Sequence, residues 1–498
     1  MQDAKRAQLC LTRLCELTSP QLLVGLWPIV LRIGRLIQQF RTQPVSPATM
    51  FHFEVELQRL LREIGRRIVQ WTLNHIEPAD RRSLPPHLFW QNDHYRLKRR
   101  SPSRNWNCLF GKIRIWRWMY ESTEDLGLPA LFPLTLRLGV VGDVATPALA
   151  DRVGQLAVEF SQQQVLSVLR EEQHVCWGVP TLRKVTQAVA EAMSPFRHQA
   201  QVDQVLEWLQ QASDDTGPRR VVLSAGRDGV MLPIRGVQKY KEGAAATLSV
   251  FNRHGKRLGT VYLGQMPEPG QTTLSHELTE LIRDVLSVWT GPPLRLVYVT
   301  DAGFHPDDYF HNVLSRMPDR HHPGCYYQWE WIVDYYHACQ YISDLSESLF
   351  GPGRAAYAWA SKMRRWLKEK PGGVFRVLRS AGALKASRGL VGDESDYNKA
   401  YGYLRRHAGW MDYSRYRRLR TPIGSGVTEA ACKIVFTQRF KRAGMKWNIA
   451  DGQPILDLRV LALSRLWSTV RTAMLETHNQ PQPQTPTSYV SIPLNTAA

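Results

Sequence analysis

The spacing of hydrophobic and polar positions changes along the chain, and this change predicts where helices give way to strands. Residues 1–80 carry Leu, Ile and Val at helical spacing, most clearly in Phe53–Leu73, "FEVELQRLLREIGRRIVQWTL". We therefore predict a helical N-terminal region, residues 1–95, which either packs on the rest of the chain or mediates self-association. The apolar run Leu22–Leu31 contains Pro28 and is shorter than the roughly 20 residues that span a bilayer. It is interpreted as a core helix.

The next pattern is a basic stretch followed by alternation. Arg96–Asn107, "RLKRRSPSRNWN", leads into Cys108–Tyr120, where apolar and basic residues roughly alternate. Alternation of this kind predicts a strand or hairpin with one charged face. This basic hairpin and linker region is placed at residues 96–140. Its charged face is either solvated or contacts a DNA backbone.

A pair of helices is predicted for residues 141–200. Apolar residues recur at helical spacing before a turn at Gly178, and Pro180 and Thr181 suit the start of a second helix. Helix, short turn and helix, with Arg183 and Lys184 early in the second helix, is the helix-turn-helix layout of DNA-binding proteins. A helical hairpin without contact to DNA has the same pattern, so both interpretations remain open.

Buried-type strands follow from residue 221. Three strands in series, an amphipathic helix at 272–289, a strand at 294–303, helical residues and a fifth strand within 326–337 are predicted. This order predicts a multidomain α/β protein whose catalytic domain is a ribonuclease-H-like mixed sheet, residues 215–337 and 415–475. A helical insertion occupies 338–414. The Pro- and Gln-rich residues 476–498 are predicted to be disordered.

Charge narrows the choice of partner. The formal net charge is +20 and the pI is about 9.8, so a polyanion is expected, with nucleic acid first and a membrane surface second. A generally basic surface is the other interpretation. The seven Cys are scattered without a CxxC pair, which fits a reducing compartment rather than a disulfide scaffold.

Three acids stand out in this basic chain. Asp228 and Asp301 each follow an apolar strand, and Glu429 follows the Gly-Ser-Gly turn of "TPIGSGVTEAACK". Acids at the ends of adjacent strands meet at one sheet edge, and close carboxylates with oxygen ligands favour two Mg²⁺ or Mn²⁺ ions. Alternatively, Asp228 and Asp301 are turn residues before Gly229 and Gly303. Asp214 and Asp215 are the alternatives to Asp228 as the first acid of the set. Asp307 and Asp308 are the alternatives to Asp301 as the second.

The stretches "VTDAGFHPDDYF", "WIVDYYHACQYI" and "TPIGSGVTEAACKIVFTQRFKRAGMKW", followed by "ILDLRVL", resemble the bacterial insertion-sequence DDE transposases of the ISKra group. These resemble, more distantly, Mutator-like and hAT elements. The resemblance covers about residues 105–465. It implies a catalytic triad of Asp228, Asp301 and Glu429. Asp334-x-x-His337 resembles a further family signature, in which His337 contacts the scissile phosphate or positions water. Alternatively, His337 is only a helix-start residue bonded to Asp334.

The resemblance implies a cytoplasmic, nucleoid-associated bacterial enzyme without a membrane partner. It would bind terminal inverted repeats, nick DNA and join the 3′-OH to target DNA, as a homodimer or larger assembly. A metal-dependent nuclease and a domesticated, non-catalytic DNA-binding protein are the alternatives. The basic residues expected to contact DNA are Arg99, Arg100, Arg183, Lys184, Lys433, Arg439, Lys441 and Arg442.

Overall fold

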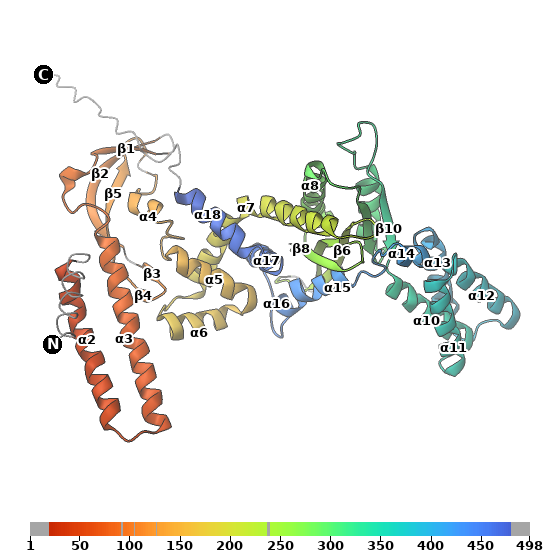
Figure 1. Ribbon diagram of the computed structural model, residues 1–498, viewed down its shortest axis with the longest axis horizontal. Helices are drawn as coiled ribbons and strands as arrows, with labels where there is room; N and C mark the ends of the chain where they lie inside the picture. Colours follow the sequence, from red (N-terminus) through yellow and green to blue (C-terminus); the bar gives the residue numbers. More distant parts are fainter. Residues whose placement is uncertain (1–18, 91–92, 104, 126, 237–239, 480–498) are drawn as a thin grey trace. The chain divides into compact units, whose positions relative to one another are not determined.

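The computed structural model describes residues 19–479, apart from 91–92, 104, 126 and 237–239. The described chain forms two compact units (Figure 1). The first contains residues up to Val189 together with those from Met474 onward, and the second is Ala190–Ala473. The architecture is multidomain and mixed α/β, as the sequence predicts.

The first unit opens with two long antiparallel helices, α2 (Pro20–Thr42) and α3 (Pro47–Asn74) (Figure 1). Each has Pro at its start and a Ser cap before it. Ser19 accepts a hydrogen bond from the backbone N–H of Gln21. Ser46 and Thr49 form a capping box. Local sequence chemistry therefore fixes where both helices begin.

The interpretation of the Leu22–Leu31 run as a core helix is wrong. Pro28 does not end the helix, and α2 buries only Leu22 and Ile29, on the face toward α3. Trp27 is 58% exposed. Among the described residues α2 is also the one helix long and apolar enough to cross a membrane by length and composition, although only 11% of its most apolar window is buried. Length and composition alone do not distinguish a membrane span from other apolar helices.

Two small sheets follow α3. One has the order β1–β2–β5 with antiparallel pairs, and the other is a two-stranded hairpin of β3 and β4. Part of the predicted basic linker is strand, because residues 96–102 pair with β5. The strands are β1 (His87–Trp90), β2 (Asp93–Pro102), β3 (Asn107–Cys108), β4 (Gly111–Lys112) and β5 (Trp116–Ser122).

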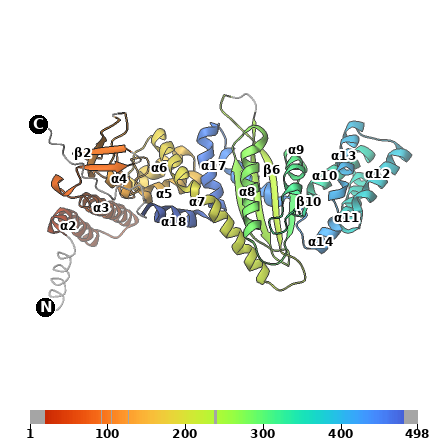
Figure 2. The same cartoon turned by 90° about the horizontal axis from the view of Figure 1, so that it is seen from above.

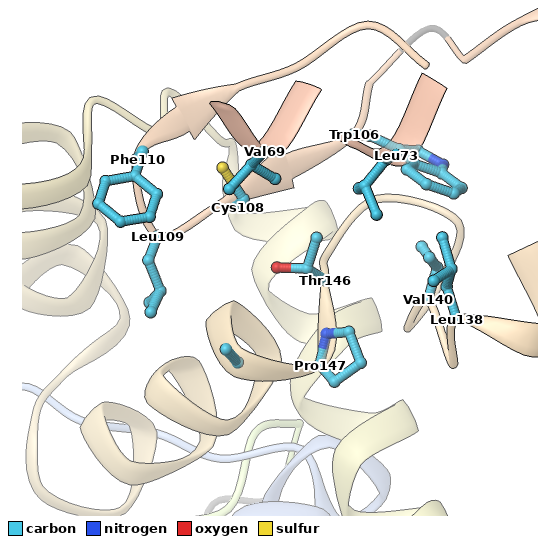
Figure 3. A pocket seen from close by; sticks show the side chains of 11 residues that line it. Val69, Leu73, Trp106, Cys108, Leu109, Phe110, Leu138, Val140, Thr146 and Pro147 are labelled. Carbon is cyan, nitrogen blue, oxygen red and sulfur yellow. The ribbon is translucent and has the colours of Figure 1, made fainter. Parts of the chain in front are cut away.

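An apolar pocket of about 230 Å³ lies beside the β3–β4 hairpin (Figure 3). Trp106, Cys108 and Phe110 line it together with Val69 and Leu73 of α3. Behind it, Trp106 is fully buried in a small core. The hairpin is thus fixed against α3 by its apolar residues.

Helices complete the first unit. Three helices, α5, α6 and α7, occupy the region where a pair was predicted for residues 141–200, and α7 continues beyond residue 200. It includes Pro195, and the chain passes from the first unit into the second within it. The helices are α4 (Pro133–Arg137), α5 (Pro147–Glu159), α6 (Gln162–Gln173) and α7 (Val179–Asp214).

A five-stranded mixed sheet forms the centre of the second unit. Its order is β10–β9–β6–β7–β8; β7 is antiparallel to β6 and β8, whereas β9 and β10 run parallel to β6. All five strands were predicted from apolar patterning. They are β6 (Val222–Leu232), β7 (Lys241–Phe251), β8 (Arg257–Gln265), β9 (Arg295–Thr300) and β10 (Trp329–Val333).

Both faces of this sheet are covered. Side chains alternate between faces along a strand: Ala244 and Ala246 belong to the core that includes α8, whereas Ala245 belongs to a core with Phe436 and Leu456. Figure 2 shows α8 lying along the sheet. The covering elements are α8 (Thr272–Val288), α9 (Phe304–Asn312), α15 (Gly426–Ala431), the π-helix η5 (Cys432–Thr437), α16 (Gln438–Phe440) and α17 (Ile449–Leu463).

The predicted helical insertion is present after β10. Its helices are α10 (Tyr335–Phe350), α11 (Arg354–Glu369), α12 (Gly373–Arg388), α13 (Glu394–Arg406) and α14 (Tyr413–Arg418). The described part of the chain ends in α18 (Trp467–Asn479), so the first residues of the predicted disordered tail are helical. The rest of that tail, residues 480–498, lies outside the described residues.

Candidate active site

Asp228 and Asp301 lie at the same level of neighbouring parallel strands. Ala225 of β6 pairs with Tyr298 of β9, an offset of 298 − 225 = 73 residues. The two aspartates have the same offset, 301 − 228 = 73. Asp228 lies inside β6, opposite Ala245 of β7, rather than at the strand end. Carrying the register three residues beyond the last hydrogen-bonded pair places the two residues at the same level of the sheet, and the charge of Asp301 acts on Asp228.

The backbone around Asp301 is tightly constrained. Ala302, directly after it, has φ 61°, a left-handed conformation that costs energy for a residue with a side chain. Asp301 Oδ1 accepts the Gly303 N–H at 3.0 Å, and the Tyr403 hydroxyl donates to the Asp301 carbonyl at 2.7 Å. The turn-residue interpretation of Asp301 is thus also present, and the insertion helix α13 holds this turn in place.

Asp334 follows the next strand at the same level. Its N–H donates to the Thr300 carbonyl at 2.8 Å, and its side chain is fully buried. Oδ1 accepts the N–H groups of Tyr336 and His337 and so caps α10. Oδ2 accepts both the N–H, at 2.5 Å, and the hydroxyl of Ser425. One buried carboxylate therefore joins the end of β10 to the Gly-Ser-Gly turn.

Ser425 connects this anchor to Glu429. Its hydroxyl lies 3.1 Å from Glu429 Oε1, and its carbonyl accepts the Glu429 N–H at 2.9 Å. A second contact docks α15 on the sheet: the hydroxyls of Thr428 and Thr247 are 2.9 Å apart and buried. Gly226 makes room for it, because a Cβ there would lie 2.2 Å from Thr428 Oγ1.

The electrostatics show that the three acids share one environment. Burial raises the pKa of Asp228 to about 6, and the negative charges of Asp301 and Glu429 add to this rise. The Cys432 thiol hydrogen-bonds Asp228 and opposes the rise, as does the Gly229 N–H, which donates to Asp228 Oδ1 at 2.7 Å. Burial and the Asp228 charge raise the pKa of the Cys432 thiol, which keeps it protonated.

His337 lies beside this cluster within an aromatic group. Its N–H donates to Asp334, as the helix-start interpretation requires. Its ring is half-buried and packs edge-on against Tyr341 and Tyr403, with centroids 5.3 and 5.8 Å away. Tyr403 is the side chain that holds the Asp301 carbonyl. His337 is therefore linked to the Asp301 turn through one aromatic neighbour.

The donor set fits a hard divalent cation in its chemistry. All three acids offer oxygen, the donor that Mg²⁺ and Mn²⁺ prefer, and their mutual repulsion at Asp228 is what a cation would relieve. Within the described residues, however, no three His, Cys, Asp or Glu side chains converge closely enough to hold a metal ion. The side chains as they stand are neighbours and do not form a coordination sphere.

The basic residues of the second unit divide into two kinds. Lys433 and Lys441 are exposed, and Arg442 donates through Nε to the Gln438 carbonyl at 2.7 Å. Arg439 is different: it is only 1% exposed and lies over the Trp447 ring at 5.1 Å. Its predicted contact with DNA is therefore wrong, because the guanidinium is part of the core next to the π-helix.

In the first unit, Arg99 and Lys184 are exposed. Arg100 donates to the Asn74 carbonyl at 3.3 Å, and Arg183 lies 3.5 Å from Gln162 Oε1. Arg117, on the predicted charged face of β5, is buried and paired with Asp143 at 2.6 Å. That strand thus presents fewer charges to solvent than alternation predicts.

Sequence reasoning missed Ser425, Thr428, Tyr403 and Cys432 as members of the site. Ser425 belongs to a turn whose glycines gave the only local signal. Thr428 and Cys432 lie one residue before and three after Glu429, so helical spacing was the available signal for Cys432. Tyr403 carries no sequence signal, because its contact spans 102 residues.

Comparison with known proteins adds no identification. No protein-family model matches the sequence, and a search of curated proteins finds no significant match.

Proposed function

We propose that this chain is a DDE transposase with a ribonuclease-H-like catalytic domain. The observation that carries the proposal is the shared register of Asp228 and Asp301, with Glu429 docked beside them by Ser425 and Thr428. The five-stranded mixed sheet supports the ribonuclease-H-like part of this proposal, because three antiparallel strands are followed along the chain by two parallel strands. The resemblance of the C-terminal motif supports the same class.

In the proposed mechanism, Asp228, Asp301 and Glu429 would hold two Mg²⁺ or Mn²⁺ ions. Such ions activate water or a 3′-OH and stabilise the leaving oxygen in phosphoryl transfer. The chain's own contribution is placement. Asp334 and Ser425 orient Glu429, and Tyr403 fixes the turn that carries Asp301. His337, beside that turn, is the candidate to contact the scissile phosphate.

The partners follow from charge and class. Net charge +20 favours DNA, and the exposed residues Lys433 and Lys441 follow Glu429 in sequence. We propose that the protein binds the terminal inverted repeats of its element and target DNA in the bacterial cytoplasm. Two DNA ends must be processed together, so a homodimer or larger assembly is part of the proposal.

The decisive experiment is a strand-cleavage and joining assay with Mg²⁺ on duplexes that carry the DNA ends flanking the coding region. Asp301→Asn and Glu429→Gln are each expected to lose both activities. Asp308→Asn is the matched control, because Asp308 is an exposed neighbour that bonds only Asn312 in the described contacts.

Full activity in Glu429→Gln would remove the proposed triad. Cleavage without joining by the wild type favours a nuclease on the same fold. Binding to the end duplexes without either reaction favours the domesticated DNA-binding protein.

A further inference from the structure

A strongly basic hollow lies in the first unit, lined by residues of α2, α3 and the β3–β4 hairpin. Its volume is about 590 Å³. Glu63 is its one acidic lining residue, and His174 closes one side. The cationic side chains that line it are Arg32, Arg59, Arg62, Arg66, Arg67 and Lys112. We call this hollow the α2–α3 basic pocket.

Three segments far apart in sequence bring these charges together. Arg59, Arg62 and Arg66 share one face of α3, since residues three, four and seven apart stack on a helix. Arg32 comes from α2. Lys112 comes from β4, and Phe110 of the same hairpin, labelled in Figure 3, lies against α3 at Gly65. Gly65 leaves room for this packing contact, because a Cβ there would lie 2.6 Å from the Phe110 ring.

Some of the charged side chains that line the pocket form ion pairs or hydrogen bonds with one another and with α2. Glu63 binds Arg66 and Arg67 at 2.7 Å each, and these bonds lower its pKa to about 2. Arg67 also donates to the Gly25 carbonyl of α2 at 2.7 Å, which ties the two helices together. Arg59 is paired with Glu56. These groups are committed to internal contacts and give the pocket a fixed shape.

Three further cationic side chains of the pocket form no ion pair among the described residues. Within the part of the chain that the structure describes, the side chains of Arg32, Arg62 and Lys112 have no ion-pair partner. The potential in the pocket is positive: burial lowers the pKa of His174, and the charges of Arg62 and Arg59 lower it further. Arg32 also acts on Glu56, whose pKa it lowers, but the lining as a whole carries six Arg and Lys side chains against one acid, Glu63. Such an excess of positive charge around one hollow attracts an anion.

We propose that the α2–α3 basic pocket binds the phosphodiester backbone of DNA through Arg32, Arg62 and Lys112. This inference rests on the proposed function, since it takes DNA to be the partner. Arg32, Arg62 and Lys112 come from three different elements, α2, α3 and β4. A DNA backbone presents a series of phosphates to cations spread in this way, whereas a single small anion presents one charge.

Helix geometry argues against a lipid surface as the occupant. The exposed apolar residues Val24, Trp27 and Leu31 share one face of α2, being three, four and seven apart. Ile29, which lines the pocket, lies on the opposite face, toward α3, and Arg32 lies at the side of the helix between the two faces. A membrane that received the apolar face would therefore lie away from the pocket lining that α3 and β4 supply.

The test is the salt dependence of binding by the full-length protein to a short fluorescent DNA duplex of arbitrary sequence. The pocket variant combines Arg32→Gln, Arg62→Gln and Lys112→Gln. Each lost phosphate contact lowers the slope of log K against log salt by about 0.9, so a fall of about 2.7 is expected. The matched control removes the same charge outside the pocket, through Arg35→Gln, Arg41→Gln and Arg82→Gln. Its slope is expected to stay close to that of the wild type.

Several outcomes overturn the inference. One is an unchanged salt slope in the pocket variant. Another is an equal fall of the slope in the pocket and control variants, which would show that only the total charge of the protein matters. Lost binding to phosphatidylserine vesicles with unchanged DNA binding would assign the pocket to lipid. Thermal melting of each variant verifies folding. The Asp301→Asn background separates the two proposals. The difference in salt slope between the pocket variant and the control variant is expected to persist there, because DNA binding by the pocket does not need Asp301. If the wild type cleaves no DNA, the proposed function fails while this slope difference still stands.

Discussion

At the scale of single residues, two glycines in similar helical settings have opposite roles. Gly65 of α3 faces the Phe110 ring, whereas a Cβ added at Gly34 of α2 would have no other atom within 4 Å. Glycine in a helix interior normally costs roughly 0.5–1 kcal/mol relative to alanine. The cost is tolerated at Gly65 because it leaves space for the hairpin that carries Lys112.

We therefore expect Gly65→Ala to destabilise the protein by about 1–3 kcal/mol, since a packed ring must move. Gly34→Ala is expected to stabilise it by about 0.5–1 kcal/mol. Urea unfolding monitored by circular dichroism measures both. Equal changes in the free energy of unfolding for the two substitutions would show that the contact between Phe110 and α3 does not stabilise the protein.

The raised pKa of Asp228 makes a prediction about pH. Its pKa is about 6 in the folded chain against 3.8 in the unfolded chain. Folding therefore favours the protonated form, and the stability it contributes is present below pH 3.8 and lost as the pH rises through about 6. In metal-free buffer, Asp228→Asn is expected to stabilise the protein above pH 6 by at most about 3 kcal/mol, from 2.2 pH units at 1.36 kcal/mol each.

The measurement is the free energy of unfolding of wild type and Asp228→Asn from below pH 4 to above pH 7, with chelator present. Asp308→Asn, at an exposed position, supplies the pH-independent comparison. A difference between Asp228→Asn and wild type that is equally large at both ends of the range would contradict the assignment.

At the scale of elements, the second unit was largely predictable and the site's supports were not. Five strands and α8 were found because buried strands and amphipathic helices have distinct periods. The residues around and after Glu429 form α15, a π-helix and α16 in place of one regular helix. No local pattern predicts that interruption, because the carbonyls of Ile434 and Val435 are satisfied by buried Arg459, over 20 residues away.

The same limit applies to two prolines. Pro28 of the first unit and Pro195 of the second lie inside continuous helices, although proline usually ends them. The aspartates were found because acids after apolar strands are rare, and the strand register later placed them together. Asp334 could be named from its motif, but its contact with Ser425 spans 91 residues and depends on the fold.

The Asp334–Ser425 link predicts a specific loss. Ser425→Ala removes the hydroxyl between Asp334 and Glu429, and we expect strand cleavage and Mg²⁺ affinity to fall about 10–100-fold, as for other groups that orient metal ligands. Ser425→Thr keeps the hydroxyl and is expected to retain most activity. Ser414→Ala, which removes a similar bond to Asp412 at 3.1 Å, is the control and should leave the Mg²⁺ dependence unchanged.

At the scale of the whole molecule, the two units carry charged groups of opposite sign with different proposed roles. The proposed catalytic acids lie in the second unit, and the α2–α3 basic pocket lies in the first. The two units can therefore be tested separately by substitution in the full chain. Pocket substitutions are expected to change DNA affinity on every sequence alike, whereas substitutions of the acids are expected to change metal binding.

Metal binding should in turn appear in the stability of the entire chain. A ligand that binds only the folded state adds about 2.7 kcal/mol at a concentration 100 times its Kd. Mg²⁺ or Mn²⁺ is therefore expected to raise the melting temperature of the wild type and of Asp308→Asn, but not of Asp301→Asn or Glu429→Gln. The rise should be larger above pH 6 than below it, because cation binding must compete with the proton that Asp228 holds at lower pH. Differential scanning calorimetry at two pH values, with Ca²⁺-free buffers and matched ionic strength, measures this directly. Equal stabilisation of all four proteins would place the cation elsewhere, and no stabilisation of the wild type at any pH would leave the three carboxylates without a metal.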